Sequence, residues 1–173
     1  MNPVAQAIIL SASTLRMLSH IGLYLLKRKA IDEDLREYSA EGVGFLPFIK
    51  VCTRQRVFRN LFYYRLGEYV SVFIQWMLPP ERSLHIWCPS IGPGAHFEHN
   101  YSTYLNAERI GSHFYCLQLV TLGNGPDGRP TIGDHVTIGA GAVVRRSVPA
   151  NCTVVGNPAV IVRKNGQKVH IEL

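Results

Sequence analysis

The sequence predicts an α+β protein in which an N-terminal helical domain precedes a parallel β-solenoid with a protruding loop. Three observations support this fold class. Residues 1–80 carry apolar side chains at helical spacing, Gly and Pro become frequent after residue 83, and a six-residue period begins at residue 91. The predicted domains are a helical assembly domain over 1–82, the solenoid over 83–162 and a C-terminal tail over 163–173.

The first half predicts three helical stretches. Residues 4–29 have apolar positions at helical spacing and end in a basic run, which suits the negative end of the helix dipole. Residues 31–39 begin a second helix with an acidic first turn. The Gly and Pro residues of 42–47 break the pattern, which resumes over 53–78 and stops at two prolines. The basic, aromatic face of this last stretch would suit a membrane surface, but we expect it to pack against other helices or another subunit.

The composition excludes several classes of protein. Hydrophobic residues make up 47% of the 173 residues and charged residues 17%, which is globular rather than disordered. The net charge of +6 favours an anionic partner such as a phosphate-bearing cofactor or an acidic glycan. The sequence contains no nucleic-acid-binding motif, so we expect no nucleic acid.

The cysteines and the N-terminal residues indicate a cytoplasmic protein. Four widely spaced cysteines without a C-x-x-C pair argue against zinc knuckles and redox motifs, and they suit a reducing compartment. The apolar stretch 4–26 is interrupted by Arg16 and His20, so it predicts a packing helix rather than a membrane span.

The second half repeats every six residues, in the units "IGPGAH", "FEHNYS", "IGSHFY", "CLQLVT", "IGDHVT", "IGAGAV" and "VRRSVP". The first positions are Ile91, Phe97, Ile110, Cys116, Ile132, Ile138 and Val144. The fifth positions are Ala95, Tyr101, Phe114, Val120, Val136, Ala142 and Val148. This period predicts a stack of short strands joined by tight corners, with the first position in the core, the fifth beneath a corner and a second-position Gly helping the chain to turn.

Two breaks interrupt the repeat. The segment "TYLNAER" has seven residues instead of six, and "GNGPDGRP" lengthens the step from Leu122 to Ile132 to ten. The second break predicts a loop that leaves the solenoid, a common place for function. It lacks the Lys-Ser/Thr ending of a phosphate-binding P-loop.

The segment 83–162 resembles the catalytic end of the serine acetyltransferases, which are left-handed parallel β-helix acyltransferases. Four stretches carry the resemblance: "LHIWCPSIGPGAHFEHNYS", "LQLVTLGNG", "PTIGDHVTIGAGAVV" and "VPANCTVVGNPAVIV". It implies acetyl transfer from acetyl-CoA to a hydroxyl, with L-serine as the leading acceptor. It also implies a homotrimer, or a dimer of trimers, with acetyl-CoA in the groove between two prisms.

The resemblance places the catalytic histidine on His99, preceded by the acid Glu98. Ser83, His85 and Arg129 fall at positions that concern the acceptor. The expected acetyl-CoA contacts are Gly123, Asn124, Ala140, Pro158 and Ala159, and the basic segment "VRKNGQK" is an alternative partner for the phosphates.

Two departures from the family pattern affect the acceptor. The acid that steadies the catalytic histidine is replaced by Ser83, which brings no charge. The histidine that helps to hold the amino acid is replaced by Arg129, which could still bind a carboxylate. A sugar hydroxyl, as in capsule or exopolysaccharide synthesis, is therefore the alternative acceptor, and a non-catalytic binding module is the alternative from another class.

The chemistry needs a base but no metal. A thioester is already activated, so an enzyme has to hold two substrates together and remove a proton from an alcohol, which suits a histidine. On a strand, Glu98 and His99 would point to opposite sides, so we expect Glu98 to face the acceptor rather than to orient His99. His96 has no assigned task, and no ligands gather to complete a metal site.

Overall fold

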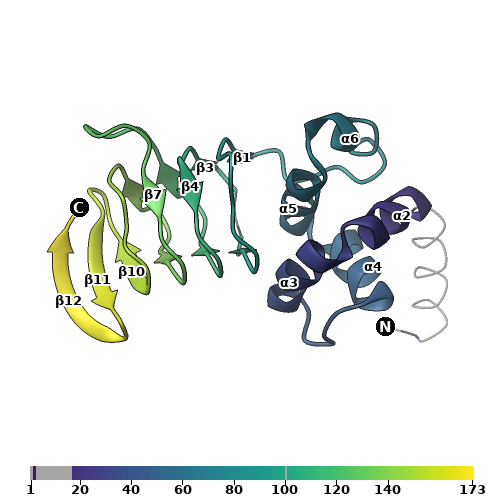
Figure 1. The fold of residues 1–173 in the computed structure, drawn as a ribbon, viewed down its shortest axis with the longest axis horizontal. Coiled ribbons are helices and arrows are strands. Elements are labelled where there is room, and N and C mark those ends of the chain that lie inside the picture. The colour runs from purple at the N-terminus through teal and green to yellow at the C-terminus, as the bar shows by residue number, and fades with distance from the viewer. Residues whose placement is uncertain (1, 3–16, 100) are drawn as a thin grey trace. The chain divides into compact units, whose positions relative to one another are not determined.

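The computed structural model describes residues 2, 17–99 and 101–173 (Figure 1). Two compact units divide the chain, Met1–Pro80 and Glu81–Leu173. The helical unit therefore ends two residues before the boundary that the sequence suggests.

The helical unit contains the described helices α2 (Leu18–Leu26), α3 (Arg28–Tyr38), α4 (Phe45–Arg54), α5 (Arg56–Leu66) and α6 (Glu68–Val72). Most of the apolar stretch 4–26 lies outside the described residues. No helix in the part of the chain that the structure describes is long and apolar enough to cross a membrane.

Helix α4 differs from the sequence prediction, which placed a break at residues 42–47. Pro47 lies in the first turn of α4, where a missing N–H removes no helical hydrogen bond, so the helix tolerates it. The stretch predicted as one helix over 53–78 is divided at Gln55, whose backbone is extended, and at Gly67, whose φ of 89° ends α5.

Aromatic rings fill the core of the helical unit. Tyr24 stacks on Phe48 with ring centroids 4.3 Å apart, and Phe62 lies 5.2 Å from Phe48. The core also holds an ion pair, in which Arg65 donates to both carboxylate oxygens of Asp34 at 2.8 and 3.0 Å.

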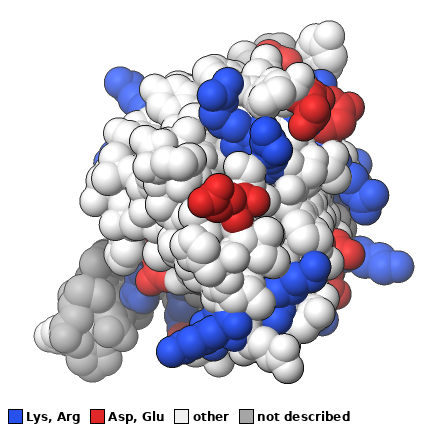
Figure 2. Space-filling view, turned by 90° about the vertical axis from the view of Figure 1, so that its left-hand side faces the viewer, with Lys and Arg blue, Asp and Glu red and all other residues white. Residues whose placement is uncertain are grey.

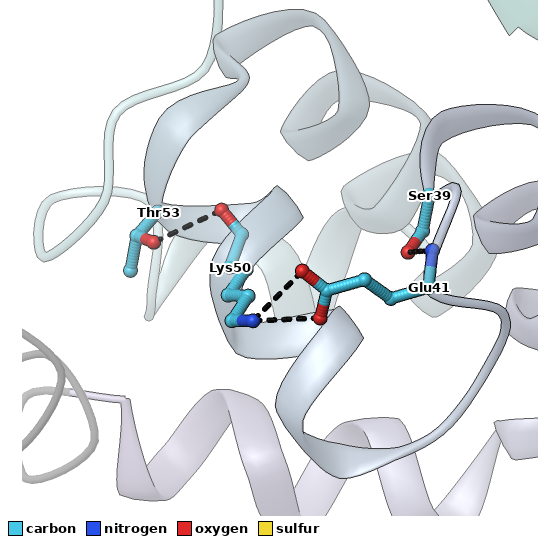
Figure 3. Close-up of polar contacts among 4 residues, drawn as sticks. All are labelled: Ser39, Glu41, Lys50 and Thr53. Atoms are coloured by element: carbon cyan, nitrogen blue, oxygen red, sulfur yellow. Dashed lines mark hydrogen bonds and ion pairs between the residues drawn. The ribbon is translucent and has the colours of Figure 1, made fainter.

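A second ion pair lies on the surface of this unit. The ammonium group of Lys50 donates to the two carboxylate oxygens of Glu41 at 2.8 and 2.6 Å (Figure 3). The hydroxyl of Thr53 donates to the carbonyl oxygen of Lys50, and the amide of Glu41 donates to the hydroxyl of Ser39.

The second unit is a left-handed parallel β-helix, which confirms the predicted fold. We number its three sheets from the N-terminal strand. Sheet 1 contains β1 (Leu84–Ile86), β3 (Thr103–Leu105), β6 (Thr121–Leu122) and β9 (Val143–Val144). Sheet 2 contains β2 (His96–Phe97), β5 (Tyr115–Cys116), β8 (Thr137–Ile138), β10 (Cys152–Val155), β11 (Val160–Lys164) and β12 (Gln167–Glu172). Sheet 3 contains β4 (Arg109–Ile110) and β7 (Thr131–Ile132). The chain passes through the sheets in turn, so each sheet is a stack of successive coils (Figure 1).

The first-position residues form the core of the prism, as predicted. All of them are buried, from Ile91 to Val144. The second-position glycines that follow Ile91 and Ile110 are required by close approach of the next coil. A Cβ on Gly92 would lie 2.5 Å from the amide nitrogen of Ser112, and one on Gly111 would lie 2.6 Å from that of Asp134. These glycines therefore set the stacking of the coils as well as the corners.

Two corners of the repeat differ from the prediction. The step between the core residues Phe97 and Leu105 is eight residues, whereas the corresponding step in the next coil is six residues. As a result Tyr101 is 51% exposed, and Thr103 takes the buried position at this corner. Val148 occupies a first position, since it pairs with Ile132 only four residues after Val144. The extra and missing residues are confined to corners, so the buried column stays in register.

The segment predicted as a tail forms regular structure. Strand β12 pairs antiparallel with β11, and β11 pairs antiparallel with β10. These strands close the C-terminal end of the prism, which faces the viewer in Figure 2, with Lys and Arg side chains spread around its edge. The exposed cations of this end include Arg163, Lys164 and Lys168.

Candidate functional site

His99 lies at the corner between β2 and β3. Its φ is 53°, in the left-handed region that non-glycine residues seldom adopt, and its side chain is 73% exposed. His113 and His135 have φ values of 51° and 53°, so this backbone belongs to the corners of the prism and is not by itself a sign of function. His99 differs from these two in its contacts: its exposed imidazole forms an ion-pair contact with Glu98, whereas the rings of His113 and His135 stack on each other with centroids 4.7 Å apart.

Glu98 supplies the carboxylate of this contact. The distance from Glu98 Oε1 to His99 Nε2 is 3.8 Å, within reach of an ion pair when the imidazole is protonated. The expectation that the two side chains point to opposite sides fails here, because His99 has left the strand and no longer alternates. Glu98 is thus placed to stabilise an imidazolium on His99.

Ser83 brings a second carboxylate to the beginning of the prism. Its hydroxyl and its amide both donate to Glu81 Oε1, at 2.8 and 3.1 Å. The carbonyl oxygen of Ser83 accepts from the amide of Thr103 at 3.0 Å, so Ser83 lies beside the strand that follows the His99 corner. Glu81 was missed in the sequence, where the only signal is an acid two residues before the serine.

The remaining predicted acceptor residues lie on different elements. His85 is on β1, where its ring stacks on that of Tyr104 at 4.8 Å. Arg129 lies in the loop after β6 and donates to Glu108 Oε2 at 2.6 Å. Glu108 follows β3 whereas His99 precedes it, so Arg129 and His99 lie toward opposite ends of that strand. His96 stacks on Tyr115 in sheet 2 at 5.2 Å and does not share the His99 corner.

A groove of about 280 Å³ lies at the C-terminal end of sheet 1; we call it the arginine groove. Its lining residues are Pro126, Val143, Arg145, Arg146, Asn157, Pro158, Ala159 and Leu173. The structure thus brings two predicted acetyl-CoA residues, Pro158 and Ala159, to one groove with two arginines. Ala140 does not line it.

The protruding loop is tied to the wall of this groove. Arg145 Nε donates to the carbonyl oxygen of Asn124 at 3.1 Å, and a side chain on Gly125 would collide with the carbonyl oxygen of Arg145. Gly123 precedes this contact directly. Arg145 and Arg146 were missed in the sequence, although two adjacent arginines between core valines were a visible signal.

Within the prism, a hydrogen bond from the backbone amide of Ser112 lowers the pKa of the exposed Asp134 carboxyl, and burial acts in the other direction on the thiols. Burial raises the pKa of the Cys116 thiol well above its usual range. Such a thiol stays protonated and is a poor nucleophile, so the candidate chemistry rests on the imidazole. Among residues 17–99 and 101–173, no group of three or more His, Cys, Asp and Glu side chains could hold a metal ion.

Comparisons with known proteins agree on the fold. No family model matches the chain. A serine acetyltransferase of Synechococcus elongatus is 50% identical over 42 residues, which are 24% of this chain and 17% of that protein. The chain therefore matches less than a fifth of the length of this curated relative.

Solved serine acetyltransferases share the fold over most of the chain. The enzyme from Brucella abortus covers 88% of this chain and 75% of its own, with 20% identity and a TM-score of 0.61. A serine acetyltransferase in complex with CoA covers 93% and 78%, with 23% identity and a TM-score of 0.53. The protein thus has the fold of the serine acetyltransferases, and its short sequence match is to the same group of proteins.

Proposed function

We propose that the protein is an acetyl-CoA-dependent O-acetyltransferase in which His99 is the general base. The observation that carries this proposal is a row of outward side chains on sheet 1, which joins the His99 corner to the arginine groove. The strand register aligns His85, Tyr104, Thr121 and Val143. Val143 lines the groove, and Tyr104 follows the corner that holds His99.

The row suits a long thioester. Neighbouring strands lie about 4.8 Å apart, so Tyr104 and Val143 are separated by roughly 10 Å. Acetyl-CoA carries phosphates at one end and its thioester at the other end of a flexible arm. In this proposal Arg145 and Arg146 bind the phosphates, and the arm lies along sheet 1 toward His99.

The residues provide the proton transfers of the reaction. The imidazole of His99 takes the proton of the acceptor hydroxyl as the oxygen attacks the thioester carbonyl carbon. The C–S bond then breaks, and the departing thiolate takes the proton from the imidazolium, so the products are an acetyl ester and CoA. Glu98 stabilises the imidazolium formed between these steps. A base of this kind typically contributes about 10²–10⁴-fold.

The similar proteins are named serine acetyltransferases, so L-serine is the first candidate acceptor. The carboxylate of an amino acid needs a cation, and Arg129 is the predicted one, but its guanidinium already binds Glu108. A sugar hydroxyl is the second candidate, favoured by the exposed rings beside His85. We further propose that the protein works as a homotrimer, or a dimer of trimers, in the cytoplasm. Its four cysteines, all within the described residues, form no disulfide bond, which suits a reducing compartment.

The test replaces His99 with a residue that keeps its backbone. Asn tolerates the left-handed region, so His99→Asn removes the base without the strain that Ala would add. We expect the rate of thiol release from acetyl-CoA, measured with a panel of L-serine, homoserine and sugars, to fall by about 10²–10⁴-fold. His113→Asn changes a histidine of the same conformation and is the matched control, with an unchanged rate.

Two results would contradict the proposal. A full rate in His99→Asn would exclude His99 as the base. No calorimetric binding of acetyl-CoA at millimolar concentration would favour a non-catalytic binding module instead.

A further inference from the structure

Three aromatic rings gather on the outward side of sheet 1, at the end opposite the arginine groove. The ring centroids of His85 and Trp87 are 5.5 Å apart, and that of Tyr104 lies 4.8 Å from His85 and 5.9 Å from Trp87. Trp87 is 57% exposed and Tyr104 is 42% exposed. We call these three residues the aromatic cluster. Tyr and Trp are enriched at binding surfaces because each combines an apolar ring with a polar group, and contiguous exposed apolar surface marks interaction sites.

The cluster adjoins the corner that holds the proposed base. Tyr104 is the second residue after that corner, and the hydrogen bond from Thr103 to Ser83 aligns the beginnings of β3 and β1 there. Along sheet 1, the cluster lies on β1, on the residue that follows β1 and on β3, whereas the groove adjoins β9. A donor that arrives from the groove and an acceptor that rests on the cluster would therefore approach His99 from opposite ends of the same row.

The chemistry of the cluster favours a ring over an amino acid. A pyranose has an apolar face of C–H groups that packs on aromatic rings, and a rim of hydroxyls that can bond to the indole N–H of Trp87, the hydroxyl of Tyr104 and the imidazole of His85. L-serine has no such face, and its carboxylate would compete with Glu108 for Arg129. We propose that the acceptor is a sugar, seated on the aromatic cluster with one hydroxyl toward His99. This inference rests on the proposed acetyl transfer and names its acceptor class.

Fluorescence can test the cluster without any turnover. The chain has two tryptophans, so Trp76→Phe leaves Trp87 as the only indole. Trp76 belongs to the helical unit and is 76% exposed. We expect saturable changes in the emission of this variant on titration with methyl glycosides or short oligosaccharides, and no change with L-serine. An emission that no sugar changes would overturn the inference.

Kinetics provide the second test, with an exposed tryptophan as the control. We expect Trp87→Ala to raise the KM for a sugar acceptor roughly tenfold, as expected for loss of an aromatic contact, and to leave the KM for acetyl-CoA unchanged. Trp76→Ala should change neither constant. An altered oligomeric mass in Trp87→Ala, measured by analytical ultracentrifugation, would overturn the inference because the rings would then be a contact between copies of the chain.

The outcomes of these experiments distinguish a failure of the sugar acceptor from a failure of the proposed acetyl transfer. Thiol release with L-serine but with no sugar would leave acetyl transfer in place and refute the sugar acceptor. Sugar-dependent fluorescence without thiol release for any acceptor would refute acetyl transfer and leave a sugar site. Sugar-dependent thiol release that Trp87→Ala weakens would support both.

Discussion

The two units of the chain build their cores in different ways. The buried polar side chains of the helical unit include His20, Asp34, Arg59 and Ser71, set among stacked aromatic rings, whereas Thr103 is the one such residue in the described part of the prism. The prism repeats one aliphatic position in coil after coil, so its core follows from its period. The core of the helical unit depends on individual contacts between residues, and no repeat in the sequence predicts these contacts. This difference predicts where each unit is most sensitive to substitution.

The largest effect is expected at the buried ion pair of the helical unit. The Asp34 side chain is 2% exposed and that of Arg65 is 12% exposed. Asp34→Asn leaves the guanidinium without its counter-charge, so we expect the free energy of unfolding to fall by about 3–5 kcal/mol. Urea unfolding followed by far-UV circular dichroism measures this loss.

The exposed ion pair of the same unit is the control for that experiment. The side chains of Lys50 and Glu41 are 36% and 58% exposed, so Glu41→Gln should cost less than about 1 kcal/mol. Equal losses in the two variants would show that burial does not distinguish these pairs, contrary to our comparison.

The next largest effect concerns Gly→Ala substitutions, which we expect to change the free energy of unfolding in opposite directions in the two units. In Gly111→Ala the new Cβ would lie 2.6 Å from backbone atoms of the next coil, and we expect a loss of about 1–3 kcal/mol. Gly22 is exposed in α2, and a Cβ added there would have no atom within 4 Å, so Gly22→Ala should gain about 0.5–1 kcal/mol through helix propensity. Thermal unfolding of both variants measures the signs. A stabilising Gly111→Ala would mean that coil stacking tolerates a side chain.

The smallest change in stability is expected at the surface of the prism. Arg129→Gln breaks the exposed pair with Glu108 and should cost less than about 1 kcal/mol in chemical unfolding. The KM values of Arg129→Gln for the two candidate acceptors are more informative about the role of this residue. We expect the KM for a sugar acceptor to stay the same, whereas a large rise in the KM for L-serine would restore Arg129 as the group that holds the carboxylate.

The sequence predicted the prism better than the helices because the core of the prism repeats one position and the core of the helical unit does not. First-position residues such as Ile110 and Ile138 recur in phase, so the fold could be inferred without any contact being known. The corners could not, because an inserted or missing residue there leaves the buried column intact, as at Thr103 and Val148. Helix α4 was missed because Pro47 looks like a break until its place in the first turn is known.

For the candidate site, the sequence by itself determined the residue types: a histidine after an acid, a loop leaving the prism, and a basic surplus. The tertiary structure decided which residues lie beside them. It turned His99 toward Glu98, placed Glu81 behind Ser83, paired Arg129 with Glu108, and added Arg145 and Arg146 to the groove. The physical reason is that a six-residue period specifies which side chains face inward. The neighbours of an outward side chain depend on corner geometry and on coils about twenty residues away, which a local pattern does not contain.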